Sequence, residues 1–424
     1  MGDTRGFLKV ERAYPAYRPV CERVKDYREV AGLRSDESSK EQASRCMDCG
    51  TPTCHWGCPI ANYIPEWNDL VFHKQWKKAI DLLHATNNLP EVTGRICPSL
   101  CEYACVLGIN DDPVTIRENE LSIIEHAFKN GLIKPRPPKR RTGKSVAVIG
   151  SGPAGLACAD QLNKAGHKVT VFEKDDKVGG ILRYGIPDFK LEKRIIDRRV
   201  NLLKKEGIEF VTGVEVGGRA SVSRIRKEYD AICLALGSRK PRDLNIEGRD
   251  LGGIYFAMDY LAQSNRRAAG EDVPKELIID AKGKHVVVIG GGDTGADCVG
   301  TAHRQDAICV VQIEILPKPP ECRGIECPWP NYPMLLKTTS SHEEGGERHW
   351  AVLTKRFVGE KGFVKKLFCA KVEFVKEAGK ACPVMKEVPG SEFEIGADIV
   401  ILAVGFAHPE HAGLLSDLKV EFDE

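Results

Sequence analysis

The sequence predicts an α/β protein in which two Rossmann-like units follow a cysteine-rich N-terminal segment. β-branched runs at residues 146–149 and 286–289 are each followed at once by G-x-G-x-x-G. Such a run is typical of a buried parallel strand, and glycines at this spacing open a helix directly after it. Seven of the sixteen cysteines lie within residues 46–105.

The overall composition excludes several classes of protein. The chain has 424 residues, 42% of them hydrophobic and 29% charged, and a net charge of +2, which gives no general attraction to nucleic acid or to a membrane. No run of 18 apolar residues predicts a transmembrane helix, and the start MGDTRGFLKV lacks the pattern of a signal peptide. We therefore expect a cytoplasmic protein with no membrane or nucleic-acid partner. The basic segment 134–141 reads as a linker, with an anion patch as the alternative.

The first chemical motif is the cysteine group. It reads C-x2-C-x4-C-x3-C-P and then C-P-x2-C-x3-C, with cysteines at Cys46, Cys49, Cys54, Cys58, Cys97, Cys101 and Cys105. Iron–sulfur clusters are held by cysteine thiolates at such spacings, and in two-cluster ferredoxins a cysteine before proline binds the other cluster. Two cubane clusters need eight ligands, and Glu118 or Glu120 can supply the eighth. A zinc ribbon would need two C-x2-C pairs, and disulfides would need an oxidising compartment.

The first glycine fingerprint consists of Gly150, Gly152, Pro153, Ala154 and Gly155. Its glycines let the backbone turn tightly and approach a pyrophosphate at the helix N-terminus. A second strand at 168–172 ends at Glu173, about 20 residues beyond the glycines, where a ribose hydroxyl is held in dinucleotide sites. The alternative is a glycine-rich turn without a ligand.

The second fingerprint consists of Gly290, Gly292, Asp293, Thr294 and Gly295. Two fingerprints a domain apart predict two dinucleotides. One is expected to be a tightly held flavin and the other a nicotinamide, because a hydride donor needs a flavin to feed one-electron clusters. Apolar strands also end in A-x-G turns at residues 235–237 and 403–405.

The nicotinamide preference depends on Glu314, which ends the strand after the second fingerprint. An acid there accepts hydrogen bonds from a free 2′-hydroxyl and repels a 2′-phosphate, which favours NADH. Lys318 is near enough in sequence to meet the phosphate of NADPH, and the first arginine is Arg323. Glu314 as a solvated strand-end charge is the structural alternative.

The order of these motifs resembles the small (beta) subunit family of glutamate synthase. The seven-cysteine pattern, PVTIRENE, GSGPAGL, VGGILRYGIPDFKL and GGGDTGADC carry the resemblance, which covers essentially the whole chain. Dihydropyrimidine dehydrogenase and the ferredoxin–NADP transhydrogenases share the module. The resemblance implies an N-terminal helical domain with two [4Fe-4S] clusters, then an FAD domain interrupted by an NAD(P)H domain. The implied boundaries are 1–143, 144–250 with 396–424, and 251–395.

The resemblance also implies ligand sets. One cluster would be held by Cys46, Cys49, Cys54 and Cys105, and the other by Cys58, Cys97, Cys101 and Glu120. Gly179 and Gly180 match a flavin-facing loop, and Arg183 with Tyr184 either faces the flavin or packs internally. No catalytic acid or nucleophile is expected.

The implied function is electron input to glutamate synthase. The small subunit oxidises NAD(P)H at FAD and passes electrons through its clusters to a large (alpha) subunit, which forms glutamate from glutamine and 2-oxoglutarate. The alternative is a relay subunit of a transhydrogenase or hydrogenase complex. The family continues after the second A-x-G strand to a Gly-Asp turn at the flavin, and this chain stops at Glu424 before it. The C-terminal part of the FAD domain is therefore expected to be incomplete or supplied by another chain.

Overall fold

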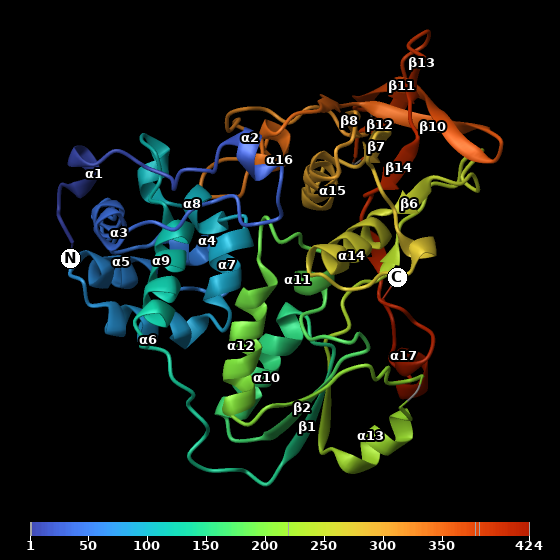
Figure 1. The fold of residues 1–424 in the computed structure, drawn as a ribbon. Helices are drawn as coiled ribbons and strands as arrows, with labels where there is room; N and C mark the ends of the chain where they lie inside the picture. The colour runs from blue at the N-terminus through green and yellow to red at the C-terminus, as the bar shows by residue number, and fades with distance from the viewer. Residues whose placement is uncertain (1, 219, 378, 381, 424) are drawn as a thin grey trace.

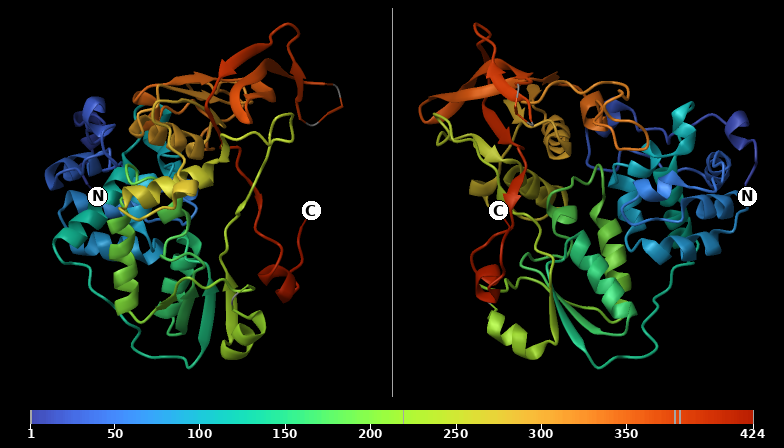
Figure 2. Two further views of the ribbon diagram at one scale, coloured as in Figure 1. Left: turned by 45° about the vertical axis from the view of Figure 1, so that its right-hand side comes forward. Right: turned by 180° about the vertical axis from the view of Figure 1, so that it is seen from behind.

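The computed structural model describes residues 2–218, 220–377, 379–380 and 382–423. A helical block at the N-terminus is followed by two parallel sheets with helices around them and by an antiparallel sheet (Figure 1). The block lies beside both sheet units, as the other views also show (Figure 2). The predicted α/β fold class is confirmed.

The helical block takes its shape from short helices around one apolar core. Trp67, Val71, Ile123 and Ile124 are fully buried there, and they come from segments about 50 residues apart. The short helices leave many chain turns between them, and the cysteines lie in these turns or in the short helices α4 and α8. The elements are α1 (Gly6–Lys9), α2 (Val20–Arg23), α3 (Asp36–Ala43), α4 (Thr53–Gly57), α5 (Ile64–Phe72), α6 (Trp76–Thr86), α7 (Pro90–Ile96), α8 (Leu100–Tyr103), η1 (Val106–Ile109) and α9 (Ile116–Lys129).

The first sheet unit has the parallel strand order β3-β2-β1-β4. β1 is buried along four of its five residues, as a strand covered by helices on both faces must be. The strands are β1 (Ser145–Ile149), β2 (Lys168–Phe172), β3 (Glu209–Val211) and β4 (Ala231–Leu234). The helices are α10 (Pro153–Lys164), α11 (Ile181–Tyr184), α12 (Lys193–Lys205) and α13 (Val222–Glu228).

The second unit repeats this plan with the parallel order β6-β14-β7-β8-β9. Its strands are β6 (Ile254–Phe256), β7 (His285–Ile289), β8 (Cys309–Ile313), β9 (Glu347–His349) and β14 (Ile399–Leu402). Its helices are α14 (Ala257–Ala268), η2 (Lys275–Leu277), α15 (Asp293–Arg304) and α16 (Ser340–Glu343). An antiparallel sheet of β10 (Val352–Glu360), β11 (Phe363–Val375), β12 (Val384–Glu387) and β13 (Phe393–Gly396) follows β9.

The chain returns to the first unit later than the sequence predicts. Residues 396–402 were assigned to the FAD domain, but β14 pairs with β6 and β7 of the second sheet. The strand is fully buried and apolar, so its sequence alone does not tell which sheet it joins. β15 (Phe406–His408) then pairs with β5 (Lys240–Pro241), and α17 (Leu414–Leu418) packs its Leu414 into the core of the first unit. The second unit is thus inserted into the first, and the chain returns to the first unit after Leu402. The division into functional domains stays a prediction.

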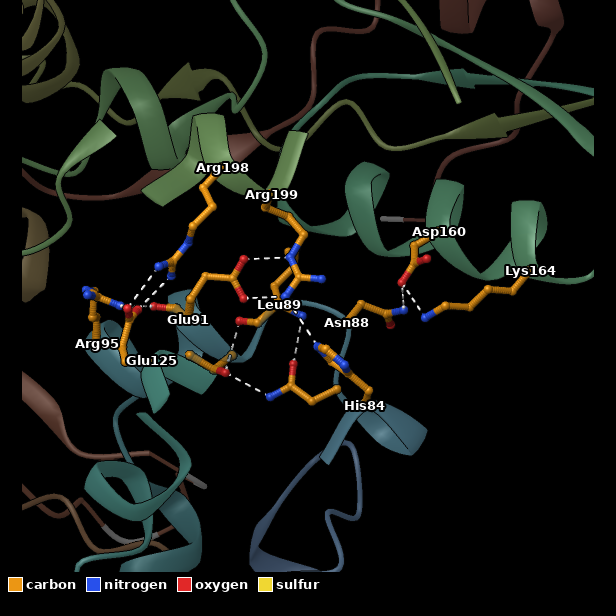
Figure 3. A network of polar contacts seen from close by, with 12 residues as sticks. His84, Asn88, Leu89, Glu91, Arg95, Glu125, Asp160, Lys164, Arg198 and Arg199 are labelled. Atoms are coloured by element: carbon orange, nitrogen blue, oxygen red, sulfur yellow. Dashed lines mark hydrogen bonds and ion pairs between the residues drawn. The ribbon is translucent and has the colours of Figure 1, made fainter. Parts of the chain in front are cut away.

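Buried ion pairs join the helical block to both units. Arg199 of α12 holds Glu91 of α7 through two hydrogen bonds of 2.6 Å each (Figure 3). Arg23 of α2 meets Glu344, next to α16, at 2.8 Å. These charges are almost completely removed from water, so the block is held in one orientation relative to the sheets.

Candidate iron–sulfur and dinucleotide sites

The structure brings together the first predicted set of cluster ligands. Cys46, Cys49, Cys54 and Cys105 line one cavity. Cys54 lies on α4, whereas Cys105 directly precedes η1, about fifty residues later in the chain. Most of the other lining side chains are apolar, including Met47, Ile64, Leu107, Val114 and Ile116, and the polar ones are Thr53 and Asn68. The cavity is therefore a protected space surrounded by thiols from separate loops.

Burial makes these thiols weaker acids than usual. It raises the pKa of Cys46 to about 12 and raises the pKa of Cys49. Burial, and next the charges of Cys105, Cys46 and Cys49, raises the pKa of Cys54. Without a cation these thiols stay protonated at neutral pH. Bound iron reverses this balance, because a coordinated thiol is deprotonated outright.

The second predicted ligand set comes from four different parts of the helical block. Cys58 follows α4, Cys97 follows α7, Cys101 lies on α8 and Glu120 lies on α9. After burial, the nearby charges of Glu120 and Cys58 raise the pKa of Cys97. Burial and the charges of Glu102, Glu120, Cys58 and Cys97 raise the pKa of Cys101 well above its usual value. The four groups are thus electrostatic neighbours.

The contacts of the two acids on α9 separate Glu120 from Glu118. Glu120 accepts hydrogen bonds from the hydroxyl of Thr93 and, at 3.2 Å, from the amide of Asn87, and burial raises its pKa to about 7. Glu118 is paired with Arg117 at 2.8 Å. Glu120 therefore fits the eighth position better than Glu118.

The first set fits a cluster better than a single ion. Among the described residues, no group of three or more His, Cys, Asp or Glu side chains is placed to hold one metal ion. The cysteines of the first set instead stand around a cavity, as ligands to the corners of a multi-iron cluster must.

The first glycine turn has the geometry that a bound pyrophosphate requires. Gly150 has φ +106°, and a Cβ added at Gly155 would lie 1.9 Å from the carbonyl oxygen of Gly150. Gly152 caps α10, and nothing lies within 4 Å of the Cβ it lacks. Pro153 and Ala154 form the first turn of α10, whose N–H groups attract an anion.

The second glycine turn repeats this geometry. Gly290 has φ +123°, and a Cβ at Gly295 would lie 2.2 Å from the carbonyl oxygen of Gly290. Gly292 caps α15, which begins at Asp293 and Thr294.

The two strand-end acids are held by the same pair of backbone bonds. Glu173 is buried and accepts the N–H groups of Ser151 at 3.0 Å and Asp175 at 2.9 Å. Glu314 accepts those of Gly291 at 2.7 Å and Leu316 at 3.0 Å. Each carboxylate is thereby fixed beside its own glycine turn, where a ribose is expected.

The loop after β2 folds back over the first turn. The N–H of Gly179 donates to the hydroxyl of Ser151 at 2.9 Å, and a Cβ at Gly180 would lie 3.0 Å from the Cα of Gly152. Arg183 donates to the carbonyl of Val178 at 2.6 Å and also binds Asp197. Tyr184 donates to Asp176 at 2.7 Å. Both side chains are engaged in shaping the loop, which favours their packing role.

The structure adds two residues that the sequence reasoning missed. Gln312 of β8 donates to the carbonyl of Gly290 at 2.8 Å, and its amide oxygen lies 2.9 Å from Nε2 of His342. Burial lowers the pKa of His342 to about 4, so the ring is neutral. Its Nδ1 accepts the N–H of Thr339 at 3.1 Å, and its Nε2 therefore donates to Gln312. A glutamine in an apolar strand carries no motif that would have indicated this role.

The segment after Glu314 crosses to the helical block. Arg323 donates to the carbonyl of Tyr103 at 3.1 Å, and the indole of Trp329 donates to the carbonyl of Cys105 at 3.3 Å. Arg323 is therefore committed to this crossing. Lys318 lies 5.7 Å from the centre of the Trp350 ring, and Arg348 lies 4.8 Å from it.

Comparison with known proteins identifies both halves of the chain. Residues 23–132 match the family described as dihydropyrimidine dehydrogenase domain II, 4Fe-4S cluster, and residues 144–423 match the pyridine nucleotide-disulphide oxidoreductases. The chain is 54% identical over its full length to the glutamate synthase [NADPH] small chain of Mycobacterium tuberculosis and covers 86% of that protein. The chain belongs to the glutamate synthase small-chain family. It is 47% identical over 97% of its length to the Bacillus subtilis member and covers 86% of it.

Two further similarities concern proteins that are not small chains. The glutamate synthase [NADH] of Schizosaccharomyces pombe is 48% identical over 96% of this chain, which corresponds to 20% of that protein. The solved structure of FprA, a Mycobacterium tuberculosis oxidoreductase, matches 64% of the chain and 71% of its own with a TM-score of 0.51 and 19% identity, which shows the fold alone. As a glutamate synthase small-chain family member, the chain is an NAD(P)H-dependent oxidoreductase. None of its described helices is long and apolar enough to cross a bilayer.

Proposed function

We propose that the chain is the electron-input subunit of a glutamate synthase, oxidising NAD(P)H at FAD and passing electrons through two [4Fe-4S] clusters to a large subunit that forms glutamate. The observation that carries the proposal is the cavity lined by the first four predicted cysteine ligands, in a helical block that is fixed against two dinucleotide turns. When bound, FAD accepts hydride from the nicotinamide and the clusters carry single electrons. The proposed compartment is the cytoplasm, and the described cysteines are free thiols, as in a reducing compartment.

The chain's own residues position these groups. The N-termini of α10 and α15 present backbone N–H groups for the two pyrophosphates, and Glu173 and Glu314 fix the riboses. Gln312 fixes the second turn by donating to the carbonyl of Gly290, and His342 holds the amide of Gln312 in place. The ion pairs between the block and the two units keep the cluster ligands at a constant distance from both turns.

The isolated subunit provides the test of this function. With NADPH it should reduce an artificial acceptor such as ferricyanide, and it should form glutamate only when a glutamate synthase large subunit is added. Glutamate formation by this polypeptide alone would contradict the subunit role. A flavin that NADPH reduces, in a protein whose iron–sulfur signal never changes, would contradict the proposed electron path.

We further propose that NADPH is the better donor, although the position of Glu314 in the sequence predicts a preference for NADH. Lys318 and Arg348 both lie near the Trp350 ring, and the strand pairing of β9 with β8, with the N–H of Glu314 bonded to the carbonyl of His349 at 2.8 Å, brings this ring close to Glu314. The two cations suit a 2′-phosphate, and two backbone N–H groups partly satisfy the charge of Glu314.

Steady-state kinetics test the assignment. Arg348→Ala should raise the KM for NADPH about tenfold, a loss of about 1.4 kcal/mol, and leave that for NADH almost unchanged. Glu314→Gln should weaken NADH more than NADPH, because only the free 2′-hydroxyl donates to the acid. If the parent protein prefers NADH and Glu314→Gln loses this preference, the proposal is wrong and Glu314 selects NADH, as the sequence predicts.

A further inference from the structure

Two thiols outside the predicted cluster ligands face each other in the first sheet unit. The Sγ atoms of Cys158 on α10 and Cys233 on β4 are 3.2 Å apart. Both side chains are partly buried and pack against the core between α10 and the sheet. They come from positions 75 residues apart, so the tertiary fold creates the pair.

The second unit supplies an internal comparison. Cys298 stands eight residues after Gly290, as Cys158 does after Gly150. The strand position that corresponds to Cys233 is Ile401, since Cys233 pairs with Val148 and Ile401 with Val288 at matched places in the two sheets. Cys298 and Ile401 are fully buried in one apolar cluster. The fold therefore places an apolar contact here, and the first unit replaces it by two thiols.

We propose that Cys158 and Cys233 are a redox-active dithiol that a small organic disulfide oxidises to an intramolecular disulfide between α10 and β4. One thiol, as its thiolate, attacks a sulfur of the reagent and releases one reagent thiol, leaving a mixed disulfide on the protein. The second thiol gives up its proton, attacks that mixed disulfide and releases the other reagent thiol. Two protein thiols are thus oxidised and one reagent disulfide is reduced to two thiols.

The geometry permits this bond without rebuilding the unit. A disulfide needs its sulfurs at about 2.05 Å, so they must approach by about 1.1 Å, which side-chain rotation can supply. Burial, with Cys233 as the next cause, raises the pKa of Cys158 to about 12. We therefore expect oxidation over minutes to hours, as for uncatalysed disulfide exchange.

The disulfide would connect the helix that begins at the first glycine turn to the strand that ends beside it. β4 continues into Ala235, whose carbonyl oxygen lies 2.4 Å from the position of a Cβ on Gly150. The bond would close a long chain segment and restrict the unfolded state. We expect the melting temperature of the oxidised protein to rise by several degrees and to fall again when dithiothreitol is added.

Peptide mapping tests the proposal on the full chain with its cofactors. The protein is incubated anaerobically with bis(2-hydroxyethyl) disulfide, quenched in acid, alkylated in denaturant and digested. The expected result is a peptide that links Cys158 to Cys233, with Cys298 recovered as an alkylated thiol. Exposed Cys21 should carry a mixed disulfide and shows that the reagent acted.

The matched variant is Cys233→Ile, which gives the first unit the cysteine–isoleucine pair of the second. It should lose both the linked peptide and the rise in melting temperature, and Cys158→Ala should do the same. Recovery of Cys158 and Cys233 as free thiols beside modified Cys21, or as separate mixed disulfides, would overturn the proposal. An equal rise in melting temperature in Cys233→Ile would assign the stabilisation to another site and also overturn it.

Discussion

The buried pair of Glu91 and Arg199 should be the strongest single link between the helical block and the first sheet unit. Glu91 is completely buried, and Arg199 donates Nε and a terminal nitrogen to its two oxygens at 2.6 Å each (Figure 3). Burial opposes the charge of Arg199, but Glu91 outweighs this and raises its pKa. His84, whose pKa burial and Arg199 lower to about 3, lies 3.3 Å from the same guanidinium. Among the described residues, Asp160 and Glu206 act on this guanidinium only through their charge, whereas Glu91 forms the ion pair with it.

Removing one partner leaves an uncompensated buried charge. Glu91→Ala should therefore lower the free energy of unfolding by about 3–5 kcal/mol. Replacing both by leucine should recover most of this loss, because an apolar pair of similar volume avoids the desolvation cost. The matched control is Arg194→Ala, which removes an exposed pair with Glu192 on the same helix and should cost about 0–1 kcal/mol.

Urea unfolding followed by circular dichroism measures these differences, and limited proteolysis of the 134–143 segment reports separation of the block. Glu91→Ala should increase cleavage there, and Arg194→Ala should not. The reasoning is wrong if Glu91→Ala costs no more than Arg194→Ala. It is also wrong if the double leucine variant is as unstable as the single one, because the loss would then reflect packing and not an orphaned charge.

Three further predictions follow from the sites. Gly155→Ala should abolish FAD binding, and Gly295→Ala should retain FAD but raise the KM for NADPH at least tenfold, because each new Cβ would overlap a backbone carbonyl. The control is Gly396→Ala, whose Cβ would have no atom within 4 Å and which should match the parent protein in absorbance and kinetics. Cys105→Ser should remove about half of the iron, by iron analysis and paramagnetic resonance, and a full complement would reject the crossed ligand set. Burial lowers the pKa of His342 from 6.5 to about 4, so as the pH falls from 7 to 5 the unfolded chain gains a proton at this position and the folded chain does not. The folded state therefore loses stability over this range, and His342→Gln should reduce that loss by about 1 kcal/mol in urea titrations. The prediction is wrong if the difference in stability between pH 7 and pH 5 is the same in the variant and the parent protein.

The fold class, the family and the two glycine turns can all be recognised from the order of amino acids alone. Each turn is specified by residues within about 25 positions of one another, so strand, glycines, helix and terminal acid can be recognised without knowing what packs on them. Gly150 and Gly290 have positive φ for reasons that are local. The crossed grouping of the cysteines came from the family resemblance, and the ligand assignment of each cysteine stays a prediction.

Contacts between segments that are far apart in the chain are visible only in the folded structure. An apolar strand such as β14 fits either sheet by its composition, and only pairing with β7 assigns it to the second unit. Lys318 lies near the Trp350 ring, and Cys233 lies against Cys158, across separations in the chain that no periodicity encodes. Glu91 reads as an ordinary surface acid in sequence, yet it is completely buried against Arg199. Such contacts depend on the combined packing of many residues, whereas a fingerprint depends on the backbone conformation of a few neighbours.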